Sequence, residues 1–204
     1  MIRFVYRHEL ADMPEIANEM FQKRRELFRD RFGWRLNVNE LGQERDEYDD
    51  LNPLYIIVTD DDGRHVASTR IMPTAGRTMI GEHFSDLTGG APVSSPKIWE
   101  ITRFFVSADC DRRAISAQLM YAGCNFAYMN GIAAYVGVIE ARMAPAFTIA
   151  GARPEIIGRG ESAESEIYAC RWETNEQLLS RLAVRAGKAA PAEARAAAVD
   201  LVAA

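Results

Sequence analysis

Residues 98 to 106 read IWEITRFFV and are the strongest strand candidate in the chain. Apolar residues occupy both faces of this stretch, which is typical of a strand covered on both sides, so we expect it at the centre of a sheet. Glu100 and Arg103 interrupt the apolar pattern. Their spacing places them on opposite faces of a regular strand, whereas one β-bulge between them would bring both to the same side. The alternative is a buried ion pair without a chemical role.

The sequence after this strand alternates between helical and strand patterns. The expected elements are a helix at 114–129, a strand at 132–139, a helix at 142–150 and a strand at 166–172. Asn130-Gly131 and Gly151 follow the two helices, and such residues commonly end a helix. This order predicts one mixed α/β sheet with helices on its faces.

The sequence before the central strand supplies the rest of the sheet. The expected elements are a strand at 2–7, an amphipathic helix at about 11–31, and a hairpin of strands at 54–59 and 66–72 joined by a DDDG turn. Residues 73–96 contain Pro, Gly and Ser clusters, which indicate a long surface connection with a short helix near 82–87. Such a connection would cover a cleft.

Length and composition limit the class of protein. The 204 residues fit a single domain, which we place at 1–185, followed by an alanine-rich tail at 186–204. The net charge of −5 gives no reason to expect a nucleic acid partner. Because we find neither a signal peptide nor an apolar run of membrane-spanning length, we predict a cytoplasmic protein without membrane insertion. The three cysteines and three histidines are widely spaced, so we expect no metal site.

Charged residues in apolar surroundings point to a site. Arg24 lies in the apolar stripe of the 11–31 helix, and we expect Arg31 to point the same way. A buried arginine needs a facing anion. The segment from Glu40 to Asp50 has six carboxylates against one arginine and is expected to supply it. Composition alone favours a solvated acidic loop, and we expect residues 33–50 to be mobile before a substrate binds.

Arg70 lies within the second strand of the hairpin, so it is another arginine embedded in the sheet. With Arg24, Arg103 and Glu100 it makes more buried charge than packing requires. A buried ionic network of this size usually indicates a charged ligand.

The same residues resemble the signature of the acyl-homoserine-lactone synthases, the autoinducer synthases of bacterial quorum sensing. The resemblance runs in order and spacing from about residue 20 to 110. The matching residues are Arg24, Phe28, Trp34, Glu44, Asp46, Asp49, Arg70, Phe84, Glu100 and Arg103. It implies an α/β fold related to the N-acetyltransferases (the GNAT fold), with a V-shaped cleft beside the central strand. It also implies an acyltransferase with no permanently bound cofactor.

The resemblance implies two substrates, S-adenosylmethionine and an acyl thioester. Acyl transfer to the S-adenosylmethionine amine, followed by lactonisation, would release N-acyl-homoserine lactone and methylthioadenosine. The donor would be an acyl carrier protein or an acyl-CoA. Residues 106–116 (VSADCDRRAIS) lack the glycine-rich phosphate loop of ordinary N-acetyltransferases, which favours the carrier protein.

The resemblance also implies a role for each matching side chain. Glu100 would be the general base, with Arg103 as its catalytic partner. The substrate-binding residues would be Arg24, Phe28, Arg31, Trp34, Glu44, Asp46, Asp49, Arg70, Phe84 and Phe105. The acyl pocket would include Ile101, Phe104 and Glu140. Family members that favour 3-oxo acyl chains usually have threonine at the position of Glu140, so a 3-oxo product is disfavoured. The alternative is that Glu140 only ends a strand at the surface.

Two other functions compete with this interpretation. An ordinary N-acetyltransferase would use acyl-CoA on another amine. A non-catalytic binding module would bind S-adenosylmethionine tightly without turnover.

Overall fold

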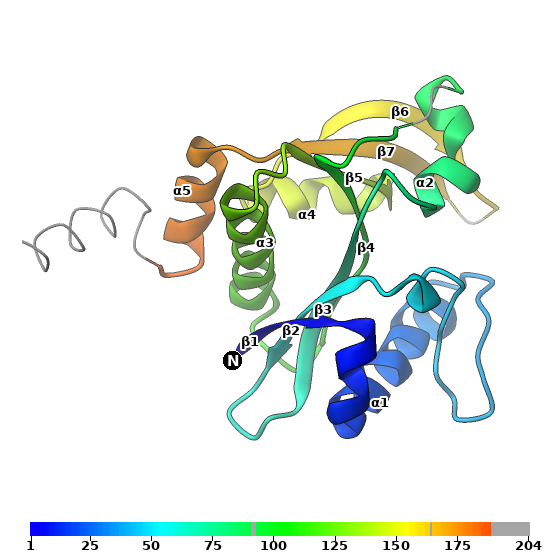
Figure 1. Cartoon of the computed structure of the whole chain (residues 1–204), viewed down its shortest axis with the longest axis vertical. Coiled ribbons are helices and arrows are strands. Elements are labelled where there is room, and N and C mark those ends of the chain that lie inside the picture. The colour runs from blue at the N-terminus through cyan, green and yellow to red at the C-terminus, as the bar shows by residue number, and fades with distance from the viewer. Residues whose placement is uncertain (91–92, 164, 189–204) are drawn as a thin grey trace, which may run out of the picture.

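The computed structural model describes residues 1–90, 93–163 and 165–188. The predicted tail at 186–204 therefore lies almost wholly outside the described residues. The described residues form one seven-stranded sheet in the order β1-β2-β3-β4-β5-β7-β6 (Figure 1). The strands are β1 (Ile2–Tyr6), β2 (Leu54–Thr59), β3 (His65–Pro73), β4 (Ile98–Val106), β5 (Ala134–Glu140), β6 (Glu155–Glu161) and β7 (Glu166–Glu173). The central position predicted for residues 98–106 is confirmed, because β4 is the fourth strand in this order.

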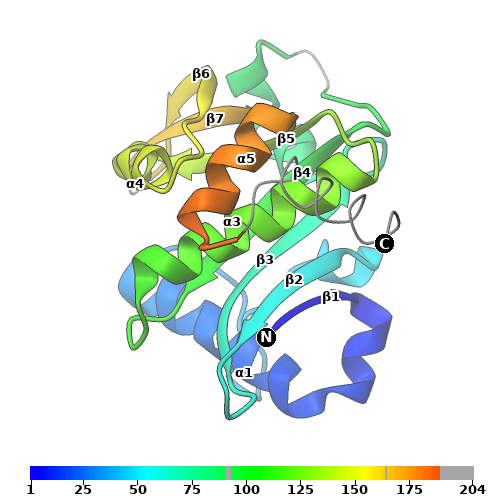
Figure 2. The same ribbon diagram turned by 90° about the vertical axis from the view of Figure 1, so that its left-hand side faces the viewer.

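Helices cover both faces of the sheet. They are α1 (Pro14–Arg24), α2 (Met79–Glu82), α3 (Arg112–Met129), α4 (Ala144–Ile149) and α5 (Glu176–Arg185). Alternate residues of β2 show how the layers form: Ile56 belongs to the core cluster that includes Leu119 of α3, whereas Tyr55 and Ile57 belong to the cluster that includes Phe21 of α1. Every residue of β2 is therefore buried, and α1 and α3 lie on opposite faces. Figure 2 shows α3 and α5 side by side on one of these faces.

The sheet opens at its centre. β4 and β5 are parallel and pair only at Ile98–Ala134, Trp99–Tyr135 and Glu100–Val136, and the two strands then separate as the V visible in Figure 1. Gly137 lies at the point of separation. A Cβ atom there would be 2.5 Å from the carbonyl oxygen of Ile101, so only glycine allows this close approach of the two strands.

A β-bulge interrupts β4, so of the two geometries considered for Glu100 and Arg103 the regular strand does not form. Ser68 of β3 pairs with Phe105 and Arg70 pairs with Thr102, so one residue of β3 faces two of β4. The bulge lies at Arg103 itself, whose φ of 53° is in the left-handed region. Because this conformation is uncommon for a residue with a side chain, it marks a constraint imposed by the surroundings.

Several predicted elements have different limits. The helix predicted at about 11–31 is confirmed from Pro14 onward but is not α-helical throughout: a 3-10 turn at Arg7–Asp12 precedes α1, and a π-helical turn at Arg25–Arg31 follows it directly. Proline favours the first turn of a helix because it lacks an N–H group. The single short helix predicted near 82–87 is instead α2 followed by a 3-10 turn at Ser85–Thr88.

Two elements were not predicted. The stretch EIIGRGE, which forms β6, contains two glycines and lies at the edge of the sheet, so its pattern is weak. The helix α5 packs against α3 and completes that layer. None of the helices in the described residues has the length and apolar character that crossing a membrane requires.

Candidate active site

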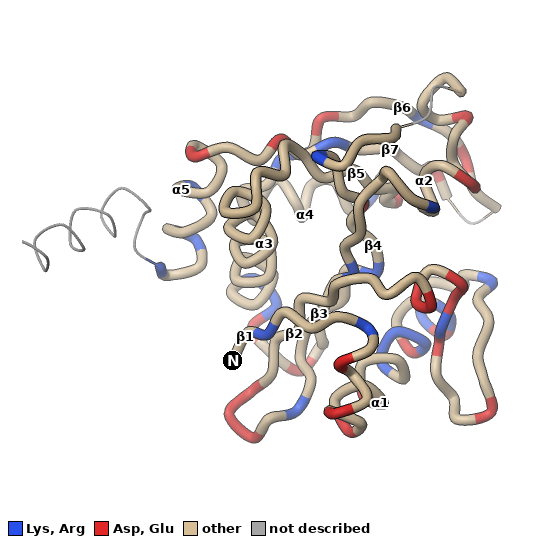
Figure 3. The backbone as a smooth tube through the Cα atoms, in the orientation of Figure 1, with Lys and Arg blue, Asp and Glu red and all other residues tan. Residues whose placement is uncertain are grey.

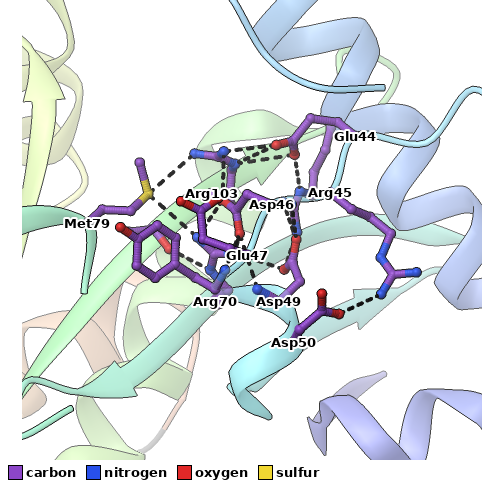
Figure 4. Close-up of polar contacts among 12 residues, drawn as sticks. Glu44, Arg45, Asp46, Glu47, Asp49, Asp50, Arg70, Met79 and Arg103 are labelled. Carbon is purple, nitrogen blue, oxygen red and sulfur yellow. Dashed lines mark hydrogen bonds and ion pairs between the residues drawn. The ribbon is translucent and has the colours of Figure 1, made fainter. Parts of the chain in front are cut away.

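Three arginines and three carboxylates form one buried network beside β4, which we call the ionic lattice. Its members are Arg24 of α1, Arg70 of β3, Arg103 of β4, and Glu44, Asp46 and Asp49 of the segment before β2. Most of it is drawn in Figure 4, and Figure 3 shows how acidic and basic positions gather in this part of the molecule. The anions that Arg24 was predicted to need are therefore supplied by the acidic segment.

Arg24 is fully engaged within the lattice. Its Nε atom donates to Glu44 Oε2 at 2.6 Å, and its two Nη atoms donate to the two oxygens of Asp49, both at 3.0 Å. The hydroxyl of Tyr55 also donates a hydrogen bond to Asp49 Oδ1, at 2.6 Å. Burial by itself would raise the pKa of Asp49, but Arg24 and Arg70 hold it far below its usual range. Asp49 is therefore ionised at any ordinary pH.

Arg70 and Arg103 share Asp46. Arg70 donates to both oxygens of Asp46, and to Asp49 Oδ1 at 2.9 Å. Arg103 donates to Asp46 Oδ2 at 2.9 Å and to Glu44 Oε1 at 2.8 Å. The lattice thus ties the acidic segment to α1, β3 and β4 at once. Its charges balance, three against three, which offsets the cost of burying them.

Glu100 is buried next to the lattice and has different partners. Its Oε2 accepts a hydrogen bond from the backbone N–H of Met79 at 3.1 Å, and its Oε1 accepts one from Ile80 at 2.6 Å. Burial raises the pKa of Glu100, although these two backbone donors act in the opposite direction. A carboxylate with a raised pKa is suited to accept a proton near neutral pH.

Two cavities occupy the cleft where β4 and β5 separate. The first has a volume of about 100 Å³ and an apolar lining that includes Ile101, Phe104, Leu119, Phe147 and Trp172; we call it the apolar cavity. The second has a volume of about 220 Å³ and a mixed lining that includes Met79, Phe84, Glu100 and Glu140; we call it the mixed cavity. Both linings also include Trp34 and Arg103.

Trp34 bridges the mouth of the cleft. Its ring stacks on Phe28, with centroids 5.0 Å apart and planes at 18°. Its Nε1–H donates to Glu140 Oε1 at 2.7 Å. Glu140 is the last residue of β5 and is only 2 % exposed, so the alternative that it ends a strand at the surface is wrong. The second oxygen of Glu140 pairs with Arg142.

The structure brings most of the predicted site residues to this cleft, but two lie elsewhere. Phe105 packs on the ring of His65, with centroids 5.3 Å apart, and is not part of the described lining of either cavity. Arg31 is exposed, so the prediction that it points the same way as Arg24 is wrong. The cause is the π-helical turn, seen in the hydrogen bond from Phe32 N to Leu27 O, because wider turns change which residues share a face.

Sequence reasoning missed the roles of four partners of the site. The backbone donors of Met79 and Ile80 depend on how the long connection before β4 folds back, which leaves no pattern in the sequence. Tyr55 appeared to be an ordinary strand residue. Thr102 accepts a hydrogen bond at its Oγ1 from Arg70 Nε at 3.0 Å. Its position in the sequence between Glu100 and Arg103 was the one available signal.

Comparison with known sequences points to one protein family. Residues 7–182 match the family model described as autoinducer synthase. An acyl-homoserine-lactone synthase from Rhizobium etli is 32 % identical over 181 residues, which cover 85 % of this chain and 84 % of the relative. An isovaleryl-homoserine lactone synthase from Bradyrhizobium diazoefficiens is 34 % identical over 153 residues, which cover 74 % of this chain and 67 % of the relative.

Comparison with solved structures confirms the predicted N-acetyltransferase-like fold. The CoA-dependent acyl-homoserine lactone synthase BjaI, solved with S-adenosylmethionine and isopentyl-CoA, superposes with a TM-score of 0.83 at 28 % identity, covering 92 % of this chain and 90 % of BjaI. A putative N-acetyltransferase from Lactobacillus plantarum, at 10 % identity and a TM-score of 0.58, shares the fold alone, over 85 % of this chain and 99 % of that protein.

Proposed function

The chain belongs to the autoinducer synthase family as an acyl-homoserine-lactone synthase, and we propose that it acylates the amine of S-adenosylmethionine and then closes the lactone. The observation that carries this proposal is the meeting of Glu100, Arg103 and an apolar cavity in one cleft. The amine of S-adenosylmethionine requires a base, and its carboxylate requires a cation. The acyl chain of the thioester requires an apolar compartment. The products are N-acyl-homoserine lactone and methylthioadenosine.

We assign S-adenosylmethionine to the mixed cavity. Arg103 contributes the cation for the substrate carboxylate, since its Nη1 faces only the weak acceptor Met79 Sδ, at 3.7 Å, among the contacts found within the described residues. The rings of Trp34 and Phe84 line the same cavity and suit the sulfonium and the adenine. The structure of BjaI with S-adenosylmethionine, at 28 % identity, supports this choice of substrate.

Glu100 is assigned as the general base. It takes a proton from the substrate ammonium, directly or through a water molecule, and the free amine attacks the thioester carbonyl. The new N–C bond replaces the C–S bond, and the thiolate leaves and takes up a proton. The methionyl carboxylate then attacks the methionyl Cγ, and the bond from this carbon to the sulfonium breaks, which closes the lactone and releases methylthioadenosine. This second step depends on orientation more than on acid or base.

The acyl group is assigned to the apolar cavity. Ile101 and Phe104 of β4 line it, together with residues of α3, β5 and α5. Glu140 lines the neighbouring mixed cavity beside Trp34 and, as a carboxylate, only accepts hydrogen bonds, so it offers no donor to a 3-oxo group. We therefore propose an acyl chain without an oxygen at C3.

The donor is assigned as an acyl-CoA, because BjaI is CoA-dependent and bound isopentyl-CoA. The acyl carrier protein favoured by the glycine-free stretch at 106–116 is the second candidate. Parallel assays with the same acyl group on CoA and on the acyl carrier protein distinguish the two donors, because the true donor should give the higher kcat/KM.

The ionic lattice is assigned a supporting role. The nitrogens of Arg24 are all bound by Glu44 and Asp49, and Arg24 is only 1 % exposed. We therefore place Arg24 and Arg70 in the support of the acidic segment, and Phe28 and Trp34 closer to the substrate. The lattice anchors the acidic segment at Glu44, Asp46 and Asp49, and through Arg103 it contributes to the lining of the mixed cavity.

The test is turnover by the purified full chain with S-adenosylmethionine and a panel of straight and branched acyl-CoAs. Mass spectrometry should find methylthioadenosine and one N-acyl-homoserine lactone in equal amounts. Loss of acyl-CoA without methylthioadenosine would support an ordinary N-acetyltransferase. Binding of S-adenosylmethionine without any turnover, on either carrier, would support a binding module and overturn the proposal.

A further inference from the structure

The helix α2 carries the two backbone donors of Glu100 and is very short. It spans only Met79–Glu82, in the connection between β3 and β4. Ile80 packs in one core cluster with Val136 of β5 and Ala169 of β7, which fixes one side of the helix. Because so short a helix is not stable by itself, the position of its donors also depends on what holds its other side.

The other side of α2 is tied to the acidic segment by Tyr48 and Glu82. The hydroxyl of Tyr48 donates to Glu82 Oε2 at 2.8 Å, and Tyr48 is only 1 % exposed. Arg77 binds the same carboxylate, with its Nε atom 2.6 Å from Glu82 Oε1, but Arg77 and Glu82 both belong to the connection between β3 and β4. The hydrogen bond from Tyr48 is therefore the one that crosses to another segment.

A second contact between the same two segments is exposed. His83 Nε2 lies 3.7 Å from Glu47 Oε1, and the two side chains are 53 % and 50 % exposed. An exposed pair of this kind contributes little to stability, and this one carries opposite charges only when the histidine is protonated. The buried hydrogen bond of Tyr48 is therefore the stronger of the two links between α2 and the acidic segment.

Tyr48 is itself placed by the ionic lattice. Its backbone N–H donates to Asp46 Oδ1 at 3.0 Å, and Arg70 Cζ lies 5.6 Å from the centroid of its ring. At the start of α2, Met79 Sδ lies 3.5 Å from Arg70 Nη2 (Figure 4). A continuous set of contacts thus runs from the lattice through Tyr48 and Glu82 to α2.

We propose that Tyr48 and Glu82 are positioning residues for the base Glu100. Their hydrogen bond holds α2 in the place where its two N–H donors reach the carboxylate. The inference rests on the proposed function for the role of Glu100. Neither Tyr48 nor Glu82 belongs to the described lining of either cavity, so their effect on the reaction passes through α2.

The titration of Glu100 reports whether its donors are in place. Burial raises the pKa of Glu100, and the two N–H groups of α2 lower it, so loss of these donors should move the titration to higher pH. Removing the negative charge of Glu82 would by itself favour ionised Glu100 and move the titration to lower pH. The other charged residues that act on Glu100 or line the mixed cavity with it stay unchanged in the test: Arg70 of β3, Asp46 of the acidic segment, Arg103 of β4 and Glu140 of β5.

The experiment follows the Glu100 carboxyl group across pH by NMR of the full chain with isotope-labelled glutamate, without substrates. The resonance is identified by its absence in Glu100→Gln. Tyr48→Phe removes the hydroxyl and keeps the ring, and Glu82→Ala removes the acceptor. In both variants the titration of Glu100 should move to higher pH. Because both lose the same bond, the double variant should move no further than Tyr48→Phe.

Turnover gives a second measurement on the same variants. At neutral pH, kcat should fall by about threefold to tenfold in Tyr48→Phe and in Glu82→Ala, the effect of one lost hydrogen bond. The pH at which activity falls in acid should rise together with the titration of Glu100. A merely structural loss would lower kcat without this rise.

Two matched variants separate the link from general changes around α2. Glu82→Gln loses the charge but keeps an oxygen that can accept from Tyr48, so its titration of Glu100 should not move to higher pH. His83→Gln removes the exposed contact with Glu47 and should leave both the titration and kcat at their wild-type values. If Tyr48→Phe fails to fold in a thermal melt, Glu82→Ala tests the same bond at a side chain that is 34 % exposed.

A wild-type titration of Glu100 in Tyr48→Phe would overturn the inference, as would an equal shift in His83→Gln. A wild-type chain that released no methylthioadenosine would instead overturn the proposed function. The NMR titration needs no turnover, so it would still decide whether Tyr48 and Glu82 position Glu100.

Discussion

Glu100 and Arg103 meet at Met79. The backbone N–H of Met79 donates to Glu100 Oε2 at 3.1 Å, and Met79 Sδ lies 3.7 Å from Arg103 Nη1. The contact requires the β-bulge of β4, because a regular strand would place the two side chains on opposite faces. One residue of the connection between β3 and β4 therefore positions both the proposed base and the proposed carboxylate-binding cation.

Replacing the proposed base should separate binding from turnover. Glu100→Gln should keep S-adenosylmethionine affinity, measured by calorimetry, and lose about 10²–10⁴-fold in kcat, the usual contribution of a general base. The amide must also point its NH₂ group at one of two backbone donors, Met79 N or Ile80 N, so a thermal melt is needed to exclude unfolding. The exposed Glu173→Gln serves as the control.

The pH dependence of wild-type activity provides a second test of Glu100 as the base. A base must be deprotonated to act, and burial raises the pKa of Glu100 above its ordinary 4.5. Activity should therefore fall in acid at a pH above 4.5. Unchanged turnover in Glu100→Gln would remove Glu100 from the mechanism.

The sequence predicted the parts of this site that follow from strand pattern and charge. A run of apolar residues identified β4, and Glu100 and Arg103 within it indicated the buried charge, while the choice between a regular strand and a bulge was left open. The lattice could be anticipated in kind, since Arg24 needed an anion and the acidic segment needed cations. Its pairings could not be predicted, because they depend on three elements meeting in space.

The failures have local physical causes. Arg31 was misplaced because a π-helical turn does not differ in pattern from an α-helix. Phe105 was assigned to the site through the family resemblance, but the alternation of β4 after the bulge directs its ring to His65. The strand β6 was not predicted because its two glycines weaken the strand pattern, whereas in the fold they allow the residue Leu87 to approach the strand closely.

The ionic lattice should be sensitive to the loss of one charge. Asp49→Asn leaves Arg24 and Arg70 with less negative charge than they face now, and should lower the free energy of unfolding by about 3–5 kcal/mol, as for other broken buried pairs. The neighbouring Asp50, whose side chain is 74 % exposed and pairs with Arg45, is a matched control. Asp50→Asn should change stability by less than about 0.5 kcal/mol in urea unfolding. Similar losses in both variants would contradict the lattice.

Order in residues 33–50 should depend on the substrate. The lattice anchors this segment at Glu44, Asp46 and Asp49, whereas Trp34 lies outside the lattice and contacts Phe28, Phe32 and Glu140. Hydrogen exchange should therefore slow in this segment when S-adenosylmethionine is added. Equal protection with and without the substrate would show that the lattice alone fixes it.

His65 should make the fold sensitive to acid. It is fully buried, and neither ring nitrogen has a hydrogen-bond partner within the described residues. Burial, and then the charge of Lys23, lowers its pKa from 6.5 to about 3. Between these values the unfolded chain binds a proton that the folded chain does not, so stability should fall as pH drops below 6.5. Asp46 and Asp49, whose pKa values lie below the ordinary 3.8, lose their contribution only at lower pH.

His65→Leu removes this titration while keeping an apolar side chain against Phe105. Urea unfolding at pH 7.5, 6 and 5 should show a smaller loss of stability in the variant than in the wild type. His83→Gln, at a side chain that is 53 % exposed, should follow the wild type. A wild-type slope in His65→Leu would show that other groups cause the acid sensitivity.

Gly158 should not tolerate a side chain, because the backbone of Leu87 lies directly against it. A Cβ atom at this residue would be 1.7 Å from the carbonyl oxygen of Leu87, and one at Gly160 would be 2.4 Å from Leu87 Cδ2. Since the first clash is with backbone, no rotamer change relieves it, and Gly158→Ala must displace the turn that contains Leu87. That turn follows α2, whose Met79 and Ile80 hold Glu100. We expect a loss of at least about 1–3 kcal/mol in stability, the cost of overpacking, together with a lower kcat.

The matched control is Gly76→Ala in the same connection. A Cβ atom at Gly76 would meet no atom within 4 Å, and its φ is outside the left-handed region. Replacing that glycine should stabilise the fold slightly or leave it unchanged, because alanine reduces the freedom of the unfolded chain. Thermal melts and methylthioadenosine release measured on both variants decide the matter. If Gly158→Ala matched Gly76→Ala in both assays, the contact with Leu87 would not be what holds α2 over Glu100.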